Sequence, residues 1–386
     1  MKIAYIINAR LPTEKAHGYQ IVKMCEAFAI QGADVLLCHP FRFQNKDLQN
    51  MNVFDFYKVK KNFKVITTAN LDLLPLSDNK ILFILQTLLW GAFAVFKLRK
   101  EEIDIYYTRD ALTVFWMSIF GFPIVYEEHV IHSGAGQFLL RMVSQKSSLK
   151  LVVVLTNFIK DNFIKLGFSP NKVIVASDGV DLAMFKNLPD KINCRKKLEL
   201  PEFVFIVGYV GRFKVFGNQE KGIPQLIEAI SILKNKNILL LLVGGPQNAV
   251  NDYLNLAKKL NVRNIKIVNQ VPVSEVPYWM RACDAVTIPW TWTKFSAYYT
   301  SPLKLFEYMA SKTPIIASDL PSLREILNEK NSILVKPGDS MDLADGIEKV
   351  LNNKNLANQI SEQAYRDVQN YTWENRARKI LSFLCI

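Results

Sequence analysis

Short apolar runs alternate with stretches of helical periodicity along almost the whole chain. Continuous apolar runs with helices between them predict parallel strands that helices cover on both faces. The fold class that this pattern predicts is α/β, with two doubly wound domains. The runs are KIAYII, DVLLCH, KVITT, DIYYT, PIVYE, LVVVLT and KVIVA in the first half, then VFIVGYVG, ILLLLVGG, IKIVN, AVTIP, TPIIAS and SILVK in the second.

The pattern lapses between residues 181 and 203, where Pro and Lys become more frequent. Together with a length of 386 residues, this lapse predicts two domains. We expect an N-terminal Rossmann-like domain over residues 1–185 and a second over residues 186–365. The remaining segment, residues 366–386, has helical spacing and an aromatic-rich apolar side, with which it could pack against either domain.

The longest uncharged run extends from Ile81 to Phe96 and is followed by Lys97, Arg99 and Lys100. It is shorter than the roughly 20 residues that span a bilayer. The run therefore predicts a helix that is either buried or membrane-facing, and burial is the favoured interpretation. The N-terminus lacks the charged and apolar regions of a signal peptide, so we expect a cytoplasmic protein.

Composition narrows the classes of partner. Forty-eight Lys and Arg against 35 Asp and Glu give a net charge of +13, which favours an acidic partner such as a phosphorylated substrate or an anionic membrane surface. A solvated basic surface without such a partner is the alternative interpretation. Nucleic acid is not expected, because the sequence shows no recognisable binding module and only the net charge favours such a partner. The five cysteines are widely spaced without a CxxC pair, which argues against a disulfide framework and a zinc knuckle.

Two cations follow the strand VFIVGYVG. Arg212 stands at the end of this strand, and Lys221 with Gly222 immediately precedes an apolar-periodic helix. The amides and the dipole of a helix N-terminus favour an anion, and a guanidinium with an ammonium would hold a diphosphate there. Two solvated surface cations are the alternative interpretation.

A second anion site is predicted by the segment TSPLKLFEYMA, residues 300–310. Thr300 or Ser301 is expected to cap its helix, with Pro302 in the first helical position. Glu307 lies in the second turn among apolar residues, where a carboxylate needs hydrogen-bond donors such as ribose hydroxyls. An exposed helical carboxylate is the alternative.

Fewer residues of the first half indicate chemistry. Gly18 is expected in a loop after the first strand, where glycine permits close approach to a phosphate or a sugar. Glu127, Glu128 and His129 end the strand PIVYE at the edge where ligands bind in such folds, although His129 could equally be a structural histidine. The chain has no HExxH or DxD motif and no comparable cluster, so no metal site is expected.

In this order, Gly18, YEEH, SDGVDLAMF, GYVGRF with EKG, and SPLKLFEYMASKTPIIASDLPSLREIL resemble a retaining glycosyltransferase of family 4. The resemblance spans nearly the whole chain and is most specific at the Arg212 and Lys221 pair and from Ser301 to Leu327. It implies the GT-B fold, in which two Rossmann-like domains face a central cleft and the last helix often crosses back to the N-terminal domain. It also implies a nucleotide-sugar donor, a glycan or lipid-linked acceptor, and no metal or other cofactor.

The resemblance also assigns roles. Arg212 and Lys221 would stabilise the departing diphosphate, and Glu307 would accept the ribose hydroxyls. Gly18 would line the diphosphate from the other domain, and His129 would contact the transferred sugar. The backbone amides that would border the diphosphate and the donor sugar are those of Ser301, Pro302, Leu303 and Lys304.

Two departures from the family pattern matter. The family often carries two glutamates eight positions apart. Glu307 corresponds to the second of them, but Tyr299 stands at the position of the first. The contact to the donor sugar is then absent or comes from Tyr299, Tyr298 or backbone amides. The second departure is the longer stretch FKVFGNQE between Arg212 and Lys221, whose role the sequence does not reveal.

The function expected from these features is transfer of a sugar from a nucleotide-diphosphate donor to an acceptor hydroxyl in cell-envelope glycan or glycolipid synthesis. A GT-B sugar-nucleotide epimerase, a phosphorylase and a non-catalytic nucleotide-binding scaffold remain as alternatives. The basic charge and the uncharged run predict peripheral contact with an anionic membrane. The donor, the acceptor, the linkage and the oligomeric state do not follow from the sequence.

Overall fold

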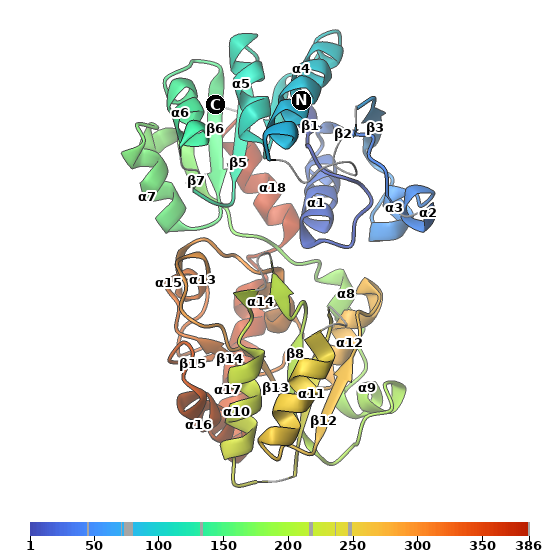
Figure 1. The fold of residues 1–386 in the computed structure, drawn as a ribbon, viewed down its shortest axis with the longest axis vertical. Coiled ribbons are helices and arrows are strands. Elements are labelled where there is room, and N and C mark those ends of the chain that lie inside the picture. The colour runs from blue at the N-terminus through green and yellow to red at the C-terminus, as the bar shows by residue number, and fades with distance from the viewer. Residues whose placement is uncertain are drawn as a thin grey trace. The chain divides into compact units, whose positions relative to one another are not determined.

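The computed structural model describes residues 1–44, 46–70, 72, 80–131, 134–215, 219–235, 237–245 and 249–384. The chain forms two compact units (Figure 1). Unit 1 comprises Met1–Asp178 with Trp373–Ile386, and unit 2 comprises Gly179–Thr372. The first boundary therefore lies after residue 178, seven positions before the expected one, because the segment 179–203 packs with unit 2.

Unit 1 contains one parallel sheet of seven strands in the order β3-β2-β1-β4-β5-β6-β7. All seven apolar runs of the first half form its strands, so this part of the sequence prediction is confirmed. The strands are β1 (Lys2–Ile6), β2 (Asp34–Pro40), β3 (Lys64–Thr68), β4 (Ile105–Thr108), β5 (Ile124–Glu128), β6 (Leu149–Val154) and β7 (Val173–Val175).

The helices of unit 1 connect these strands, and one comes from the far end of the chain. α5 contacts both α4 and α6, and α1 contacts the C-terminal helix α18. The helices are α1 (Ala16–Ile30), α2 (Lys46–Gln49), α3 (Val53–Tyr57), α4 (Lys80–Leu98), α5 (Ala111–Ile119), α6 (Ala135–Ser144), α7 (Asn157–Lys165) and α18 (Trp373–Ser382).

Unit 2 contains a six-stranded parallel sheet in the order β12-β11-β8-β13-β14-β15. The six apolar runs of the second half form it, as predicted. Its strands are β8 (Phe205–Val210), β11 (Ile238–Val243), β12 (Ile265–Val268), β13 (Ala285–Ile288), β14 (Ile315–Ser318) and β15 (Ile333–Val335).

Helices accompany this sheet too, and the stretch between Arg212 and Lys221 contributes a short antiparallel pair, β9 (Lys214–Val215) and β10 (Gln219–Glu220). Residues 216–218 of that stretch lie outside the described residues. The helices are α8 (Ala183–Lys186), α9 (Lys191–Lys197), α10 (Ile223–Ile232), α11 (Val250–Lys259), α12 (Val276–Arg281), α13 (Lys294–Tyr298), α14 (Leu303–Ala310), α15 (Pro321–Arg324), α16 (Ser340–Asn352) and α17 (Lys354–Val368).

The core of unit 2 is divided by its sheet. Along β8, Ile206 and Val210 belong to one buried cluster, whereas Val207 and Tyr209 belong to the other. This division follows from the alternation of side chains along a strand. Because both faces of the sheet are covered, its strands are mostly apolar, which is why the sequence revealed them; the edge strand β12, with Lys266, is less buried.

The uncharged run from Ile81 to Phe96 forms the helix α4, as predicted, but only part of its side chains are buried. Trp90, Ala94 and Val95 are buried, whereas the side chains of Leu89 and Phe93 are 64% and 46% exposed. Among the described residues, no helix has the length and apolar character needed to cross a bilayer.

Two local expectations were wrong. α1 begins at Ala16, so Gly18 lies in its first turn and not in a loop. α14 begins at Leu303 with the extended residue Pro302 as its N-cap, and no side chain caps it. The Thr300 hydroxyl instead donates to the carbonyl of Ser296 over 3.0 Å. Pro302 itself has extended backbone, with ψ 129°, so the helix starts one residue later than predicted.

Candidate functional site

The strand order of unit 2 reverses between β8 and β13. From β8 the chain passes outward to β11 and β12, then returns to the other side of β8 at β13. In doubly wound sheets, ligands bind beyond the carboxyl ends of the strands at such a reversal. Gly211 and Arg212 follow β8 there, and Pro289 and Trp290 follow β13.

Lys221 is fixed at this edge by the glycine that follows it. Gly222 has φ +77°, and a Cβ added there would lie 1.7 Å from the carbonyl oxygen of Pro289, so only glycine fits. α10 therefore starts directly against the end of β13. The Lys221 ammonium lies 3.8 Å from the centre of the Trp290 ring. Burial lowers the pKa of Lys221 to about 8.

Lys304 and Glu307 share one face of α14, since residues three apart are neighbours on a helix. The Lys304 ammonium lies 3.5 Å from the centre of the Tyr209 ring. Burial, with a smaller effect of the Lys221 charge, holds the pKa of Lys304 well below its ordinary value. Burial also raises the pKa of Glu307 to about 7, against the opposing effect of Lys304.

Arg212 is exposed, and its carbonyl oxygen accepts a hydrogen bond from the Tyr209 hydroxyl over 2.8 Å. The structure thus gathers Arg212, Lys221, Lys304 and Glu307 around the end of β8. Three basic side chains with one carboxylate have the chemistry to bind an anion that also carries hydroxyl groups. The sequence anticipated this group, apart from the Lys304 side chain, of which only the amide was singled out.

The other predicted donor-binding residues of unit 2 lie in the approach to α14. Ser301, Pro302 and Leu303 are half-buried. Tyr299 is the C-cap of α13, and its ring packs edge-on against Phe295 with 6.4 Å between the ring centres.

His129 follows β5 in unit 1 and uses both ring nitrogens. Its Nδ1 lies 2.7 Å from Nη2 of Arg109, and its Nε2 lies 2.6 Å from Oε1 of Glu127. A guanidinium only donates, so Nδ1 accepts and Nε2 carries the proton that is donated to Glu127. Burial, with the Arg109 charge, lowers the pKa of His129 despite the opposing effect of Glu127. The imidazole is therefore neutral near pH 7.

Glu127 is the centre of a buried network that the sequence did not reveal. Although burial opposes its ionisation, Arg376, His129 and Arg109 hold its pKa well below the ordinary value. Tyr107 also donates a hydrogen bond to this carboxylate. The sequence analysis did not single out Arg109, but its position could have indicated it. Arg109 follows β4, and the strand order of unit 1 reverses between β1 and β4, where ligands bind in such sheets.

Gly18 is buried beneath a tyrosine. A Cβ added at Gly18 would lie 2.2 Å from the hydroxyl oxygen of Tyr57 and 2.6 Å from Cγ2 of Thr13. The Tyr57 hydroxyl also accepts from the amide of Thr13 over 2.8 Å. Close packing in unit 1 therefore requires a glycine at this position, whatever approaches it from outside.

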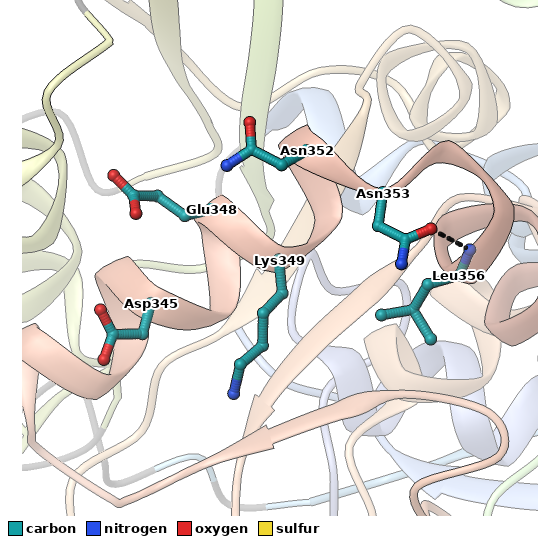
Figure 2. Close-up of a pocket in the computed structure, with 6 residues that line it drawn as sticks. All are labelled: Asp345, Glu348, Lys349, Asn352, Asn353 and Leu356. Carbon is teal, nitrogen blue, oxygen red and sulfur yellow. Dashed lines mark hydrogen bonds between the residues drawn. The ribbon is translucent and has the colours of Figure 1, made fainter.

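A surface hollow of unit 2 lies apart from these residues (Figure 2). It is formed by α16 and the start of α17, where Asn353 accepts a hydrogen bond from the amide of Leu356 over 2.9 Å. None of the predicted site residues lines it; the lining residues are Asp345, Glu348, Lys349, Asn352, Asn353 and Leu356. Over the described ranges, no three His, Cys, Asp or Glu side chains are grouped so that they could hold a metal ion.

Parts of this chain are similar to known glycosyltransferases. Residues 190–367 match the family model described as "Glycosyl transferases group 1". The "Uncharacterized glycosyltransferase MJ1607" of Methanocaldococcus jannaschii is 28% identical over 240 residues, which are 60% of this chain and 58% of that protein. The "Capsular polysaccharide biosynthesis glycosyltransferase CapM" of Staphylococcus aureus is 27% identical over 59% of this chain and 57% of its own length.

The crystal structure of HepE from Anabaena in complex with UDP aligns over the full length of both chains, with a TM-score of 0.75 and 19% identity. At this identity the likeness shows the fold, which is GT-B, with two Rossmann-like α/β domains. The chain spans little more than half the length of the two relatives named above. Their names and the family match support the expectation of a glycosyltransferase enzyme.

Proposed function

We propose that this protein is a retaining glycosyltransferase of family 4, which moves a sugar from a nucleotide-diphosphate donor to an acceptor hydroxyl. The observation that carries the proposal is the group of Arg212, Lys221 and Glu307 at the reversal of the unit 2 sheet. Arg212 and Lys221 stabilise the charge that develops on the departing diphosphate, and Glu307 accepts hydrogen bonds from the ribose hydroxyls. The binding of UDP by HepE supports a nucleotide donor.

Retention of configuration is proposed to come from attack on the same face that the diphosphate leaves. The leaving phosphate takes the proton of the acceptor hydroxyl as the new bond forms, so no protein nucleophile is required. Tyr299 stands where the family often has its first glutamate. The segment around Tyr299 is therefore proposed to contact the donor sugar.

For unit 1, the family resemblance assigns His129 a contact with the transferred sugar and Gly18 a place beside the diphosphate. Because both ring nitrogens of His129 already have partners, its contact with a sugar uses the ring edge or the backbone carbonyl, or exchanges one of these bonds. The Glu127 network fixes the orientation of the ring, since Arg109 and Glu127 each hold one nitrogen.

The acceptor is proposed to be lipid-linked or an envelope glycan, with the protein on the cytoplasmic side of an anionic membrane. α4, α5 and α6 adjoin one another in unit 1 and carry exposed apolar side chains. Basic residues accompany them, and Arg99 covers the Phe96 ring at 3.7 Å. The exposed apolar residues are Phe83, Ile84, Leu85, Leu89, Phe93, Phe96, Ile119, Phe120, Phe138 and Met142. The name of CapM is in line with an envelope acceptor.

The deciding experiment is incubation of the protein with a panel of nucleotide-sugars in the absence of acceptor. Slow release of a free sugar with the donor's anomeric configuration is expected for one of them. An epimerised donor would indicate the epimerase, and stimulation by inorganic phosphate with release of a sugar 1-phosphate would indicate the phosphorylase. Binding of a nucleotide-sugar without any turnover would indicate the scaffold.

A further inference from the structure

The Lys304 side chain is placed at an energetic cost. Its ammonium is buried, and no hydrogen-bond acceptor contacts it in the described part of the chain. The Tyr209 ring beneath it, at 3.5 Å, is its main neighbour. A buried ammonium with no acceptor is destabilising, and a methionine would fill the same space without that cost. Such costs persist where the group serves a ligand.

The backbone at the end of β8 makes room for this ammonium. Gly211 has φ +138°, and a Cβ added there would lie 2.7 Å from Nζ of Lys304. Gly244, at the end of the neighbouring strand β11, has φ +142°, and its added Cβ would lie 2.1 Å from the carbonyl oxygen of Gly211. Two successive strand ends are therefore glycines, and the Lys304 ammonium occupies the space beside the first.

The charges around Lys304 leave it without a full counterion. Lys221 faces it with the same sign and Glu307 with the opposite sign, while the exposed Arg212 follows Gly211 directly. The first turn of α14 adds amides that no side chain caps. An anion with at least two charges would neutralise this excess, and the diphosphate of a nucleotide carries them.

We propose that the Lys304 ammonium binds the donor diphosphate as a third cation beside Arg212 and Lys221. The inference rests on the proposed function, because it takes a nucleotide-sugar as the ligand. The flexible four-carbon stem allows the ammonium to move from the Tyr209 ring to a phosphate oxygen.

Binding is then coupled to protonation. In the free protein the pKa of Lys304 is well below its ordinary value, because of burial and of Lys221, and the pKa of Lys221 is about 8. A diphosphate beside the two amines raises both pKa values, so the protein takes up protons as it binds at pH 8.5. Glu307, with a pKa of about 7, is already ionised at that pH and contributes little.

The test is calorimetric titration of the full chain with UDP, GDP and ADP, then with the monophosphate of whichever nucleotide binds. Lys304→Met is expected to lower the affinity for the nucleoside diphosphate by about 10- to 100-fold, as for loss of a charge-assisted hydrogen bond. The affinity for the monophosphate should fall by less than about 3-fold. Lys294→Met is the matched control, since Lys294 is exposed on the neighbouring helix α13, and it should leave both affinities unchanged.

Repeating the titration at pH 8.5 in two buffers of different ionisation enthalpy measures the protons taken up. Lys304→Met should take up fewer protons than the wild type and melt at the same or a higher temperature; Lys304→Gln serves if the methionine variant fails to fold. The inference is overturned if wild type and variant bind the diphosphate with equal affinity. It is also overturned if the variant loses affinity for the diphosphate and for the monophosphate by the same factor. If the wild type binds none of the nucleotides, the proposed function fails as well, which distinguishes the two failures.

Discussion

The guanidinium of Arg376 lies 3.2 Å from the carboxylate of Glu127, although the two residues are 249 positions apart in the chain. Both side chains are only 2% exposed. Nε of Arg376 also donates to the carbonyl oxygens of Ala176 and Ser177, over 3.2 Å and 3.1 Å. The helix α18 is thereby joined to the strand that ends beside His129, and the His129 ring is oriented by a residue from the other end of the chain.

Arg376→Met is expected to destabilise unit 1 by about 3 to 5 kcal/mol, because it leaves the Glu127 carboxylate buried with fewer partners. Thermal or urea unfolding of the whole chain measures the loss. Arg378→Met is the control, since Arg378 is exposed on the same helix, and its effect should stay within about 0.5 kcal/mol. Similar stabilities for the two variants would show that the ion pair contributes little.

Arg212→Ala and Lys221→Ala are each expected to reduce turnover of the donor by about a hundredfold or more. Each removes a cation whose interaction strengthens as the diphosphate leaves. The measurement is kcat with the donor identified by the nucleotide-sugar panel, and Lys294→Ala serves as the exposed control. Near-normal turnover in both variants would remove the proposed mechanism.

The dependence of kcat/KM on pH should be bell-shaped, because it reports groups of the free protein. On the acidic side Glu307, whose burial raises its pKa to about 7, becomes protonated and no longer accepts two ribose hydroxyls. On the basic side Lys221, whose burial lowers its pKa to about 8, loses its charge. The maximum is therefore expected between these two values, and a flat profile from about pH 6 to 9 contradicts these roles.

Activity is expected to persist in EDTA, since Arg212 and Lys221 are proposed to neutralise the diphosphate in place of a divalent ion. The assay compares initial rates before and after chelation, with and without added Mg²⁺ or Mn²⁺. Complete loss of activity that either ion restores would overturn this expectation.

Sedimentation with liposomes tests the proposed membrane contact. Binding to anionic liposomes at low salt, release at high salt and no binding to neutral liposomes are expected, because basic residues near anionic lipid contribute about 1 kcal/mol each. Replacing the exposed Leu89 and Phe93 of α4 by serine should weaken binding by about tenfold or more, through lost apolar burial.

Phe203→Ser is the matched control for that experiment. Phe203 is 89% exposed and belongs to unit 2, whereas α4 belongs to unit 1, so its loss should leave the binding unchanged. Equal indifference of the wild type to anionic and neutral liposomes would favour a soluble acceptor.

The sequence by itself determined the two sheets. Every strand of the two parallel sheets coincides with an apolar run such as ILLLLV, because a parallel strand that is covered on both faces has few polar positions. The sequence also placed Arg212, Lys221 and Glu307 correctly at strand ends and helix starts, since these positions follow from the local pattern of glycine, proline and apolar spacing.

Tertiary structure alone decided which distant residues meet. Gly18 is buried beneath Tyr57, and Arg376 pairs with Glu127, although no local pattern connects these segments. The unit boundary after residue 178 likewise depends on which segments pack together. The same holds for Lys304, whose ammonium lies beside Gly211 only because α14 packs against the end of β8. Helical spacing places Lys304 on a face of its helix, but what that face meets depends on how the helix packs against the sheet.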